Sequence, residues 1–232
     1  MATIYNPNIV TDQLLFSLDA ANIKSYPGSG VAWNNLTNDF DAELINGPTY
    51  TTGVDGHITL DGSNDYAQMT IQTGSFSTAE GTFIAWIRRN GASSGTYQGI
   101  LFNRGGSPST SATGMNFYSN QHKVAYHWND GSNTYQYSGG AVVPDLTWTM
   151  LAVSVSSSAA NLYTCNSNGI TVATNTVSHS SATFSNFAIG RDTPDGGRYF
   201  RGDISIVQFY KKALTAAEVK QNFDALKGRY GY

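Results

Sequence analysis

Short apolar runs, separated by glycine, serine, asparagine and proline, dominate this chain and limit the folds open to it. The run Phe83–Ile87 is apolar at every position, so as a strand it would carry apolar side chains on both faces. Such a strand belongs in the middle of a sheet that is covered on both sides. Leu151–Ser156 alternates instead, with Leu151, Val153 and Val155 expected to face the core. About thirteen such runs and a single convincing helix predict an all-β sandwich or barrel.

Length and cysteine content indicate one large domain. With 232 residues, of which 40% are hydrophobic, the chain can bury a substantial core. We expect an N-terminal arm over residues 1–12 and a single domain over residues 13–232. Cys165 is the only cysteine, which excludes an intramolecular disulfide. The N-terminus lacks the basic and apolar regions of a signal peptide, so we expect synthesis in a reducing cytoplasm.

The charge pattern argues against two classes of partner. Only 12% of the residues are charged, and the formal net charge is −3. The sharpest basic clusters are pairs, Arg88-Arg89 and Lys211-Lys212, whereas nucleic-acid binding needs a basic stripe. The sequence has no polybasic patch of the kind that binds membranes. We therefore expect neither nucleic acid nor a membrane as a partner.

The C-terminal region contains the clearest local signals. Thr215 and Glu218 form the T-x-x-E pattern of a capping box, and Leu214 and Val219 are placed for a hydrophobic staple. We expect a short helix that ends at Gly228.

The tripeptide Arg201-Gly202-Asp203, just upstream, matches a cell-adhesion signal. Over Phe200–Ile206, however, apolar or glycine positions alternate with polar ones, which favours a strand. We expect Arg201 and Asp203 on its polar face, in a structural rather than a receptor-binding role.

The same stretch resembles a known family. The letters F-x-G-x-I-x-x-V-x-x-Y-x-x-A-L-T-x-x-E-V, Phe200 to Val219, resemble the C-terminal signature of laminin G-like domains in the concanavalin A-like lectin/glucanase superfamily. ITLDGSNDYAQM and GTFIAWIRR are similar to earlier strands of that family and occur in the right order. The resemblance spans residues 13–226. It implies a jelly-roll sandwich of two antiparallel sheets with one short C-terminal helix, in which the large rings of Trp86 and Trp148 suit the core between the sheets.

A narrower resemblance concerns the setting of the protein. The run L-D-A-x-N-x-x-S-Y-P-G-S-G, Leu18–Gly30, looks like the start of laminin G-like virion proteins of tailed bacteriophages. It implies a non-enzymatic virion structural protein, as a capsid decoration or tail-fibre component, that meets other virion proteins as a homo-oligomer and can contact host-surface glycans. The arm Met1–Thr11 is the expected attachment element. The alternative is a free carbohydrate-binding or adhesin module.

Catalysis is not expected. Glycosidases use two carboxylates that flank the sugar bond, and on one strand these would appear as E-x-D-x-E. The glutamates Glu43, Glu80 and Glu218 do not form this pattern, and Glu218 belongs to the capping box. Asp39 and Asp41 are spaced by two but lie in a loop-like segment. Cys165 lies in an expected strand and is assigned to packing.

Calcium is the one cofactor that the resemblance raises. Related domains often hold Ca²⁺ through Asp side chains and carbonyls at loop edges, and Asp19, Asp61 and Asp65 lie in the matching regions. Ser205 stands where the family usually has an Asp, which weakens the case for a site near the last strand. The alternative is that Asp61 and Asp65 cap their turn through backbone hydrogen bonds.

One segment, VAYHWNDGSNTYQY from Val124, has the composition of a sugar site, because sugars bind to aromatic faces flanked by polar groups. Its candidate carbohydrate-binding residues are Tyr126, His127, Trp128, Asn129, Tyr135 and Tyr137. The alternative is a plain β-hairpin that turns at Asn129-Asp130-Gly131, with half of its aromatic rings packed as cross-strand core pairs.

Overall fold

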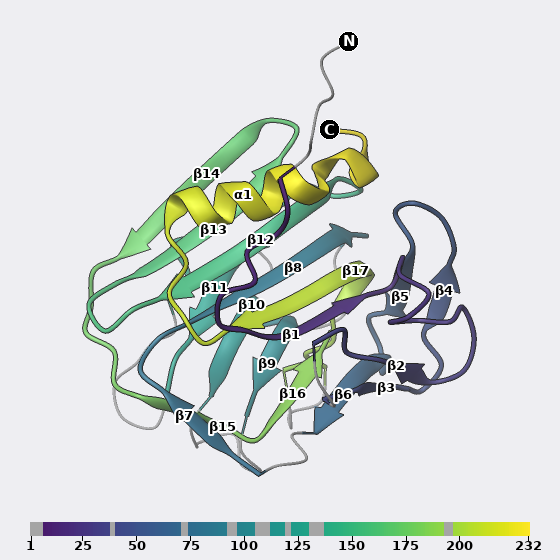
Figure 1. Cartoon of the computed structure of the whole chain (residues 1–232), viewed down its shortest axis with the longest axis horizontal. Coiled ribbons are helices and arrows are strands. Elements are labelled where there is room, and N and C mark those ends of the chain that lie inside the picture. The colour runs from purple at the N-terminus through teal and green to yellow at the C-terminus, as the bar shows by residue number, and fades with distance from the viewer. Residues whose placement is uncertain are drawn as a thin grey trace.

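The computed structural model describes residues 7–37, 40–70, 74–91, 97–104, 112–118, 122–129, 137–192 and 197–232. Its strands form two large antiparallel sheets packed face to face, and helix α1, Ala216–Leu226, lies across the outer side of one of them (Figure 1). The predicted all-β sandwich of two antiparallel sheets with a short C-terminal helix is confirmed. No helix in the described part of the chain is long and apolar enough to cross a membrane.

Sheet A carries the helix. Its eight strands follow the order β14-β13-β12-β8-β17-β5-β4, and β1 also pairs with β17. The strands β5 and β1 share one edge of β17, because β5 pairs with Arg201–Ile204 and β1 with Ile206–Tyr210. The strands of sheet A are β1 Leu14–Asp19, β4 Thr49–Thr51, β5 His57–Asp61, β8 Gly81–Arg89, β12 Trp148–Val155, β13 Ala160–Asn166, β14 Gly169–Asn175 and β17 Arg201–Tyr210.

Sheet B has seven strands in the order β11-β10-β9-β16-β6-β3-β2. A small third sheet pairs β7, Phe76–Thr78, with β15, Ala182–Phe184. The strands of sheet B are β2 Ala32–Trp33, β3 Ala42–Ile45, β6 Tyr66–Thr70, β9 Gly99–Asn103, β10 Thr113–Tyr118, β11 Lys123–His127 and β16 Asn186–Ile189.

The strand β8 has two apolar faces because sheet A is covered on both sides. Phe83, Ala85 and Ile87 lie in the core between the sheets, whereas Ile84 and Trp86 lie in a second core between sheet A and α1. The predicted two-sided burial is confirmed. Leu151, Val153 and Val155 also face the core between the sheets, as expected.

The expected placement of two tryptophans is wrong. Trp86 and Trp148 both lie in the second core, beneath the C-terminal segment, and not between the sheets. The ring of Trp86 stacks on Phe223 and on Tyr230, at centroid distances of 5.6 Å and 4.0 Å. Side-chain alternation explains the correction, since Trp86 is one residue from Ala85 and Trp148 is three residues from Leu151, and an odd spacing along a strand puts a side chain on the opposite face.

A β-bulge interrupts the alternation predicted for β17. Ile204 lies in the core between the sheets, but Ile206 lies in the second core, because the register shifts between them. Ser205, at the bulge, is fully buried; its hydroxyl donates to the carbonyl of Gly56 and accepts from the Tyr230 hydroxyl. The expectation that Ile206 shares a face with Ile204 is therefore wrong.

The Arg-Gly-Asp tripeptide is part of this strand. Asp203 is buried, where it pairs with Arg88 at 2.8 Å and accepts a hydrogen bond from the Thr59 hydroxyl at 2.6 Å. Arg201 is exposed. A receptor cannot reach the carboxylate without breaking both contacts, so the structural reading of this tripeptide is supported.

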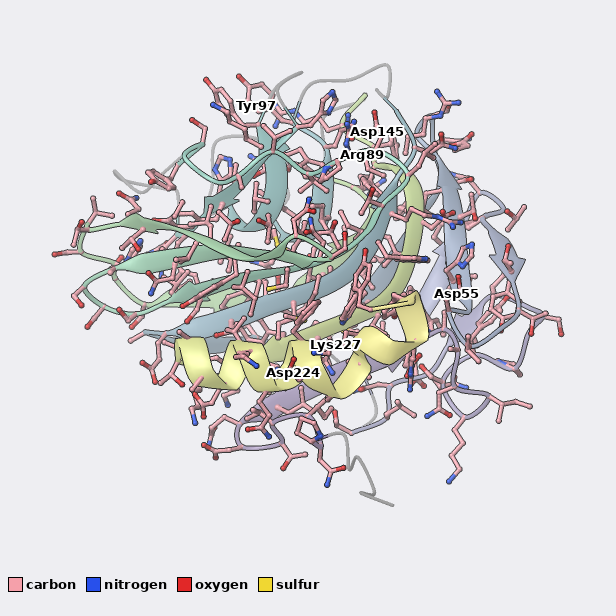
Figure 2. All side chains as sticks on the ribbon, turned by 90° about the horizontal axis from the view of Figure 1, so that it is seen from above. Asp55, Arg89, Tyr97, Asp145, Asp224 and Lys227 are labelled. Atoms are coloured by element: carbon pink, nitrogen blue, oxygen red, sulfur yellow. The ribbon has the colours of Figure 1, made fainter. Side chains whose placement is uncertain are left out.

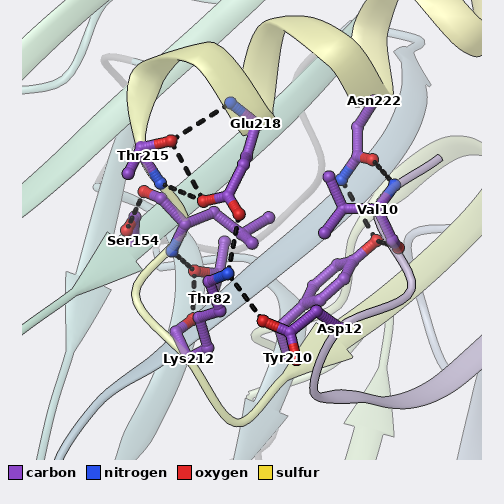
Figure 3. Close-up of polar contacts among 10 residues, drawn as sticks. Val10, Asp12, Thr82, Ser154, Tyr210, Lys212, Thr215, Glu218 and Asn222 are labelled. Atoms are coloured by element: carbon purple, nitrogen blue, oxygen red, sulfur yellow. Dashed lines mark hydrogen bonds and ion pairs between the residues drawn. The ribbon is translucent and has the colours of Figure 1, made fainter. Parts of the chain in front are cut away.

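The helix begins as its sequence indicates. The Thr215 side chain accepts from the Glu218 backbone, the Glu218 carboxylate accepts from the Thr215 backbone, and both Leu214 and Val219 are buried (Figure 3). The predicted end is wrong: Gly228 lies inside a 3₁₀ turn, Lys227–Tyr230, that continues from α1. Gly231 takes the left-handed conformation instead, with φ of 82°.

Residues 7–12, part of the expected arm, contact the protein's own helix. Val10 is buried; its N–H donates to Asn222 Oδ1 at 2.7 Å, and its carbonyl accepts from the Tyr210 hydroxyl at 2.9 Å (Figure 3). Asp12 pairs with Lys212 at 2.8 Å. The segment from Val10 onward is therefore held to the sandwich by buried hydrogen bonds.

Candidate functional site

The hairpin that composition suggested as a sugar site buries two of its aromatic rings. Tyr126 and Trp128 are fully buried, in the core between the sheets. The Tyr126 hydroxyl bonds to His179 Nε2 at 2.7 Å, and Trp128 Nε1 donates to the Ser180 carbonyl at 2.7 Å. Neither ring has a face to offer a sugar. Their candidate role as carbohydrate-binding residues is corrected, because Tyr126 and Trp128 occupy inward positions of the strand and its extension.

Two further residues of that prediction make contacts within the fold. Asn129 Nδ2 donates to the Ser180 hydroxyl and the Ser181 carbonyl, and the Tyr137 hydroxyl donates to the Thr174 carbonyl. Tyr135 lies outside the described residues. His127 is the exception in this group, because it points to the outer face of sheet B.

That outer face follows from strand alternation. Met115 and Phe117 of β10 face the core, so Gly114, Asn116 and Tyr118 face outward. On the flanking strands, His127 and Phe102 oppose Gly114. The rings of Phe102 and His127 meet edge to face with centroids 5.5 Å apart. We call Tyr97, Phe102, Asn116, Tyr118 and His127 the polar face of sheet B.

Asn116 is the unusual member of this face. Its side chain is fully buried, and neither Oδ1 nor Nδ2 has a hydrogen-bond partner among the described residues. Leaving a buried donor or acceptor unsatisfied costs about 1–3 kcal/mol per group. An amide that lacks both partners is rare in folded proteins and calls for a water, an ion or a ligand atom.

A buried ion cluster lies close to Gly99, the sheet partner of Asn116, because the backbone nitrogen of Asp192 passes over that glycine. Asp192 is 1% exposed, and its two carboxylate oxygens pair with Arg104 at 2.8 Å and Arg198 at 2.8 Å. The Arg198 guanidinium also lies over the Tyr97 ring at 5.4 Å, and Tyr97 meets Tyr118 edge to face at 5.5 Å. Because the two arginines are held by one carboxylate and by rings, their positions are fixed before any ligand arrives.

Arg191 extends the face toward β6. Its guanidinium lies 3.7 Å from the centre of the Tyr66 ring, and Tyr199 lies beside Tyr66. The backbone of Arg191 passes directly over Gly99, where any Cβ would collide with it. Gly99 is the partner of Asn116 in the sheet, so the backbone of Arg191 lies one strand away from Asn116.

Backbone strain marks the edge of this face. Tyr97 and His122 both have left-handed backbones, with φ of 61° and 53°, a conformation that bulky side chains rarely adopt. Arg89 contacts His122 Nδ1 at 2.8 Å and Asp145 at 2.6 Å. Figure 2 shows Tyr97, Arg89 and Asp145 together on the side of the sandwich opposite α1. Strain of this kind is concentrated at functional sites.

The three aspartates proposed as calcium ligands do not assemble into a site. Among the described residues no group of three or more His, Cys, Asp or Glu side chains is placed to hold a metal. Asp19 is taken by Arg229, at 2.6 Å. Asp61 accepts from the backbone of Ser63 at 2.7 Å, and such hydrogen bonds lower its pKa. The carboxylates of Asp19 and Asp61 already bond to other groups of the protein. Too few of these oxygens converge to provide the roughly six to eight ligands that Ca²⁺ requires.

Asp65 completes the turn that Asp61 caps. Its Oδ2 accepts from the backbone N–H of Asp61 at 3.2 Å, and burial raises its pKa. The arrangement corresponds to the turn-capping alternative.

Two carboxylates also lie on the outer side of sheet B, near its far edge. Asp41 and Glu43 flank Ala42, whose side chain is in the core, so both point outward, and both are exposed. Asp41 accepts from the backbone of Asn35 at 2.7 Å. The strands β16 and β6 separate this pair from the polar face of sheet B.

Comparison with known proteins assigns the family. The family described as the concanavalin A-like lectin/glucanases superfamily matches residues 61–220, and the chain belongs to it. No curated protein sequence matches it at the threshold used for significance.

Similar solved structures share the fold at low identity. A Trypanosoma rangeli sialidase in complex with sialic acid has a TM-score of 0.65 and 13% identity, over 97% of this chain and 36% of the sialidase. Domain 4 of AbnA, a GH43 extracellular arabinanase from Geobacillus stearothermophilus, in complex with arabinotriose, has a TM-score of 0.63 and 17% identity, over 92% of this chain and 98% of that domain. The botulinum neurotoxin serotype D binding domain has a TM-score of 0.64 and 11% identity, over 94% and 52%. The chain thus spans about a third of the length of the sialidase chains and nearly all of the arabinanase domain.

Of the residues on the polar face, only His127 was among the candidate carbohydrate-binding residues predicted from the sequence. Asn116, Tyr118 and Phe102 carry a signal that alternation could have supplied, because they occupy the outward positions of two neighbouring strands. Tyr97 and Arg191 carry no such signal, since their places depend on loop conformation and on the close approach of Arg191 to Gly99.

Proposed function

We propose that this chain is a non-catalytic carbohydrate-binding module and that the polar face of sheet B is its site. The observation that carries the proposal is the Asn116 amide, which is buried without a partner beside half-buried tyrosine rings and fixed arginines. Similar domains in complex with sugars, such as the arabinanase domain with arabinotriose, support the proposal at the level of the fold.

The chemistry of the face suits sugars. A sugar hydroxyl both donates and accepts hydrogen bonds, and so does a primary amide such as that of Asn116. The half-buried rings of Tyr97 and Tyr118 at the edge of the face provide the apolar area on which the C–H side of a sugar ring packs. Because Asn116 is fully buried, one water that the sugar orders bridges the sugar to this amide and satisfies it.

The absence of catalysis is part of the proposal. Both oxygens of Asp192 are held by arginines, so this carboxylate is not free to act on a glycosidic oxygen. Asp41 and Glu43 are exposed, whereas the acid of a glycosidase sits in an environment that keeps it protonated. Release of reducing sugar from a bound polysaccharide, lost on Glu43→Gln, would contradict this part of the proposal.

A glycan array with the purified chain tests the binding proposal. We expect at least one glycan to bind and Asn116→Ala to weaken that binding about tenfold or more, because one or two hydrogen bonds in a buried site are lost. Asn168→Ala, in the exposed turn after β13, is the matched control and should bind like the native chain. Trp128→Ala is unsuitable, because removing a fully buried ring would damage the core.

We further propose that the module is made in the host cytoplasm and acts on a tailed-bacteriophage virion, as a homo-oligomer that contacts other virion proteins. The resemblance of Leu18–Gly30 to virion proteins supports this setting. The strand β14 adds support because it forms an open edge of sheet A, with Ile170 and Val172 exposed by 40% and 51%.

Purified virions test the setting by mass spectrometry. We expect the chain in every particle preparation, and we expect deletion of residues 1–6 to lower its incorporation. The deletion stops there because Val10 is bonded to Asn222, so a longer one would disturb the fold. Recovery of the native chain only outside the particles would contradict the setting while leaving the binding proposal intact.

A further inference from the structure

We infer that the polar face of sheet B binds an acidic glycan and that Arg191 is the residue that pairs with its negative group. This inference rests on the proposed glycan-binding function and adds the chemical class of the ligand. It depends on the contacts of Arg191, on the contacts of the other arginines, and on the charge around Asn116.

Arg191 has a fixed position and, among the described residues, no anionic partner. Its guanidinium is held over the Tyr66 ring at 3.7 Å, close enough for a cation–π interaction. Its Nε is buried and has no hydrogen-bond partner, and no carboxylate pairs with the group among the described residues. A guanidinium that is placed by a ring but lacks an acceptor is ready for a bidentate contact with an anion.

The other arginines show that the lack of a carboxylate partner for a partly buried guanidinium is unusual within the described part of the molecule. Each of five is paired with an aspartate, as the ion pairs Arg88–Asp203, Arg89–Asp145, Arg104–Asp192, Arg198–Asp192 and Arg229–Asp19. Arg201, by contrast, is exposed, and its charge is solvated. Arg191 is therefore a half-buried arginine for which the described part of the chain provides no carboxylate acceptor.

The local charge agrees with an anionic ligand. Arg104 and Arg198 lie around the carboxylate of Asp192, and Arg191 adds a positive charge that pairs with no carboxylate among the described residues. The whole chain, in contrast, has a formal net charge of −3. A positive site on a negative protein attracts acidic ligands selectively, and more strongly at low salt.

Asn116 and Arg191 define two contacts on one ligand. The backbone of Arg191 crosses Gly99, the sheet partner of Asn116, so the two side chains start from neighbouring points. An amide recognises a hydroxyl or an acetamido group, and a guanidinium recognises a carboxylate or a sulfate. A uronic or sialic acid, or a sulfated sugar, presents both kinds of group on one or two rings.

Paired probes that differ only in charge test the inference. Binding is measured by calorimetry with polygalacturonate against its full methyl ester, and with sialyllactose against lactose; heparin tests sulfate. We expect an acidic probe to bind about tenfold or more tighter than its neutral partner. Its binding should weaken as NaCl rises from about 50 to about 500 mM. In Arg191→Gln the acidic probe should bind no more tightly than the neutral one. Arg191→Lys keeps the positive charge but not the forked guanidinium, so its affinity for the acidic probe should lie between those of the native chain and Arg191→Gln. Arg201→Gln is the control and should match the native chain.

The outcomes separate the two proposals. Equal binding of charged and neutral probes, or native affinity in Arg191→Gln, overturns the inference, and if Asn116→Ala still abolishes that binding, the proposed function stands. If no glycan of either class binds, the proposed function fails and the inference fails with it. A heat-unfolding curve for Arg191→Gln like that of the native chain excludes loss of the fold as the cause.

Discussion

The outer faces of the two large sheets differ in whether the chain itself supplies hydrogen-bond partners for their buried polar groups. On sheet A, side chains reach across to the C-terminal segment: Ser154 donates to the Leu214 carbonyl at 2.8 Å, Thr82 donates to the Lys212 carbonyl at 2.7 Å, and Asn222 donates to the Tyr210 hydroxyl at 3.1 Å (Figure 3). The chain thus supplies its own partners there. On sheet B, the buried amide of Asn116 has neither a donor nor an acceptor among the described residues.

The outer face of sheet A also buries some unpartnered atoms, but of another kind. They are the indole nitrogens of Trp86 and Trp148, on large rings whose apolar burial offsets the cost, and one oxygen of Gln208. The Gln208 amide still donates to Ser17 at 3.2 Å. Sheet A is thus covered by its own helix, which stabilises the fold, whereas the polar face of sheet B keeps an unsatisfied group that an outside ligand can use.

The largest expected effect concerns the cover of sheet A. Phe223→Ala removes a buried ring that stacks on Trp86 at 5.6 Å, and we expect a loss of about 3–5 kcal/mol in the free energy of unfolding, measured in urea. Glycan affinity of the folded fraction should not change. A loss below about 1 kcal/mol would mean that α1 does not anchor this face.

A moderate effect is expected at the start of the same helix. Thr215→Ala removes the N-cap, whose hydroxyl accepts from the Glu218 backbone at 3.3 Å, and should cost about 0.5–2 kcal/mol by urea unfolding. Thr215→Ser keeps the hydroxyl and is the control. Equal loss in both variants would contradict a capping role.

The pH dependence should arise on the side of sheet B. Burial lowers the pKa of His122 and of His179, with Arg89 adding to the effect at His122. The unfolded chain, whose histidines titrate near about 6.5, therefore binds more protons than the folded chain in mild acid. Stability should change little between about pH 7.5 and 8 and decrease as the pH falls through 6.5.

Urea unfolding at several pH values checks this, with His122→Asn as the comparison because asparagine tolerates the left-handed backbone. The variant should lose part of the pH dependence. If the free energy of unfolding of the native chain rises as the pH falls from 7.5 to 5.5, these histidines are not the source of the pH dependence.

The smallest effect on stability is expected at the polar face itself. Asn116→Leu replaces an unsatisfied buried amide by an apolar side chain of similar size, so the free energy of unfolding should stay the same or rise by about 1 kcal/mol. The same change should abolish glycan binding. A clear loss of stability would show that Asn116 is satisfied within the fold, and the contrast between the sheets would disappear.

Much of the fold could be predicted because it rests on local patterns. The apolar run at Phe83–Ile87 defined a central strand, and Thr215 with Glu218 defined the helix start. The strands β2, β3, β4 and β7 were not predicted, since two to four residues carry no readable period. The bulge at Ser205 was also missed, because one extra residue moves Ile206 to the opposite face without any change in composition.

The site was harder to predict than the fold. Aromatic and polar composition pointed to Tyr126 and Trp128, but composition cannot tell which face of a strand is inward, and both rings are in the core. The neighbouring outward positions hold Asn116 and Tyr118. Arg191 could not be placed from sequence, because its position depends on the backbone crossing at Gly99.

The central claim is that a glycan binds to the polar face of sheet B. Backbone NMR shifts of the native chain, recorded during titration with a glycan that the array identifies, test it most directly. We predict the largest shifts in β9, β10 and β11 and at Arg191 and Arg198, with α1 unchanged. Shifts confined to α1 and sheet A, with none in β9–β11, would contradict it.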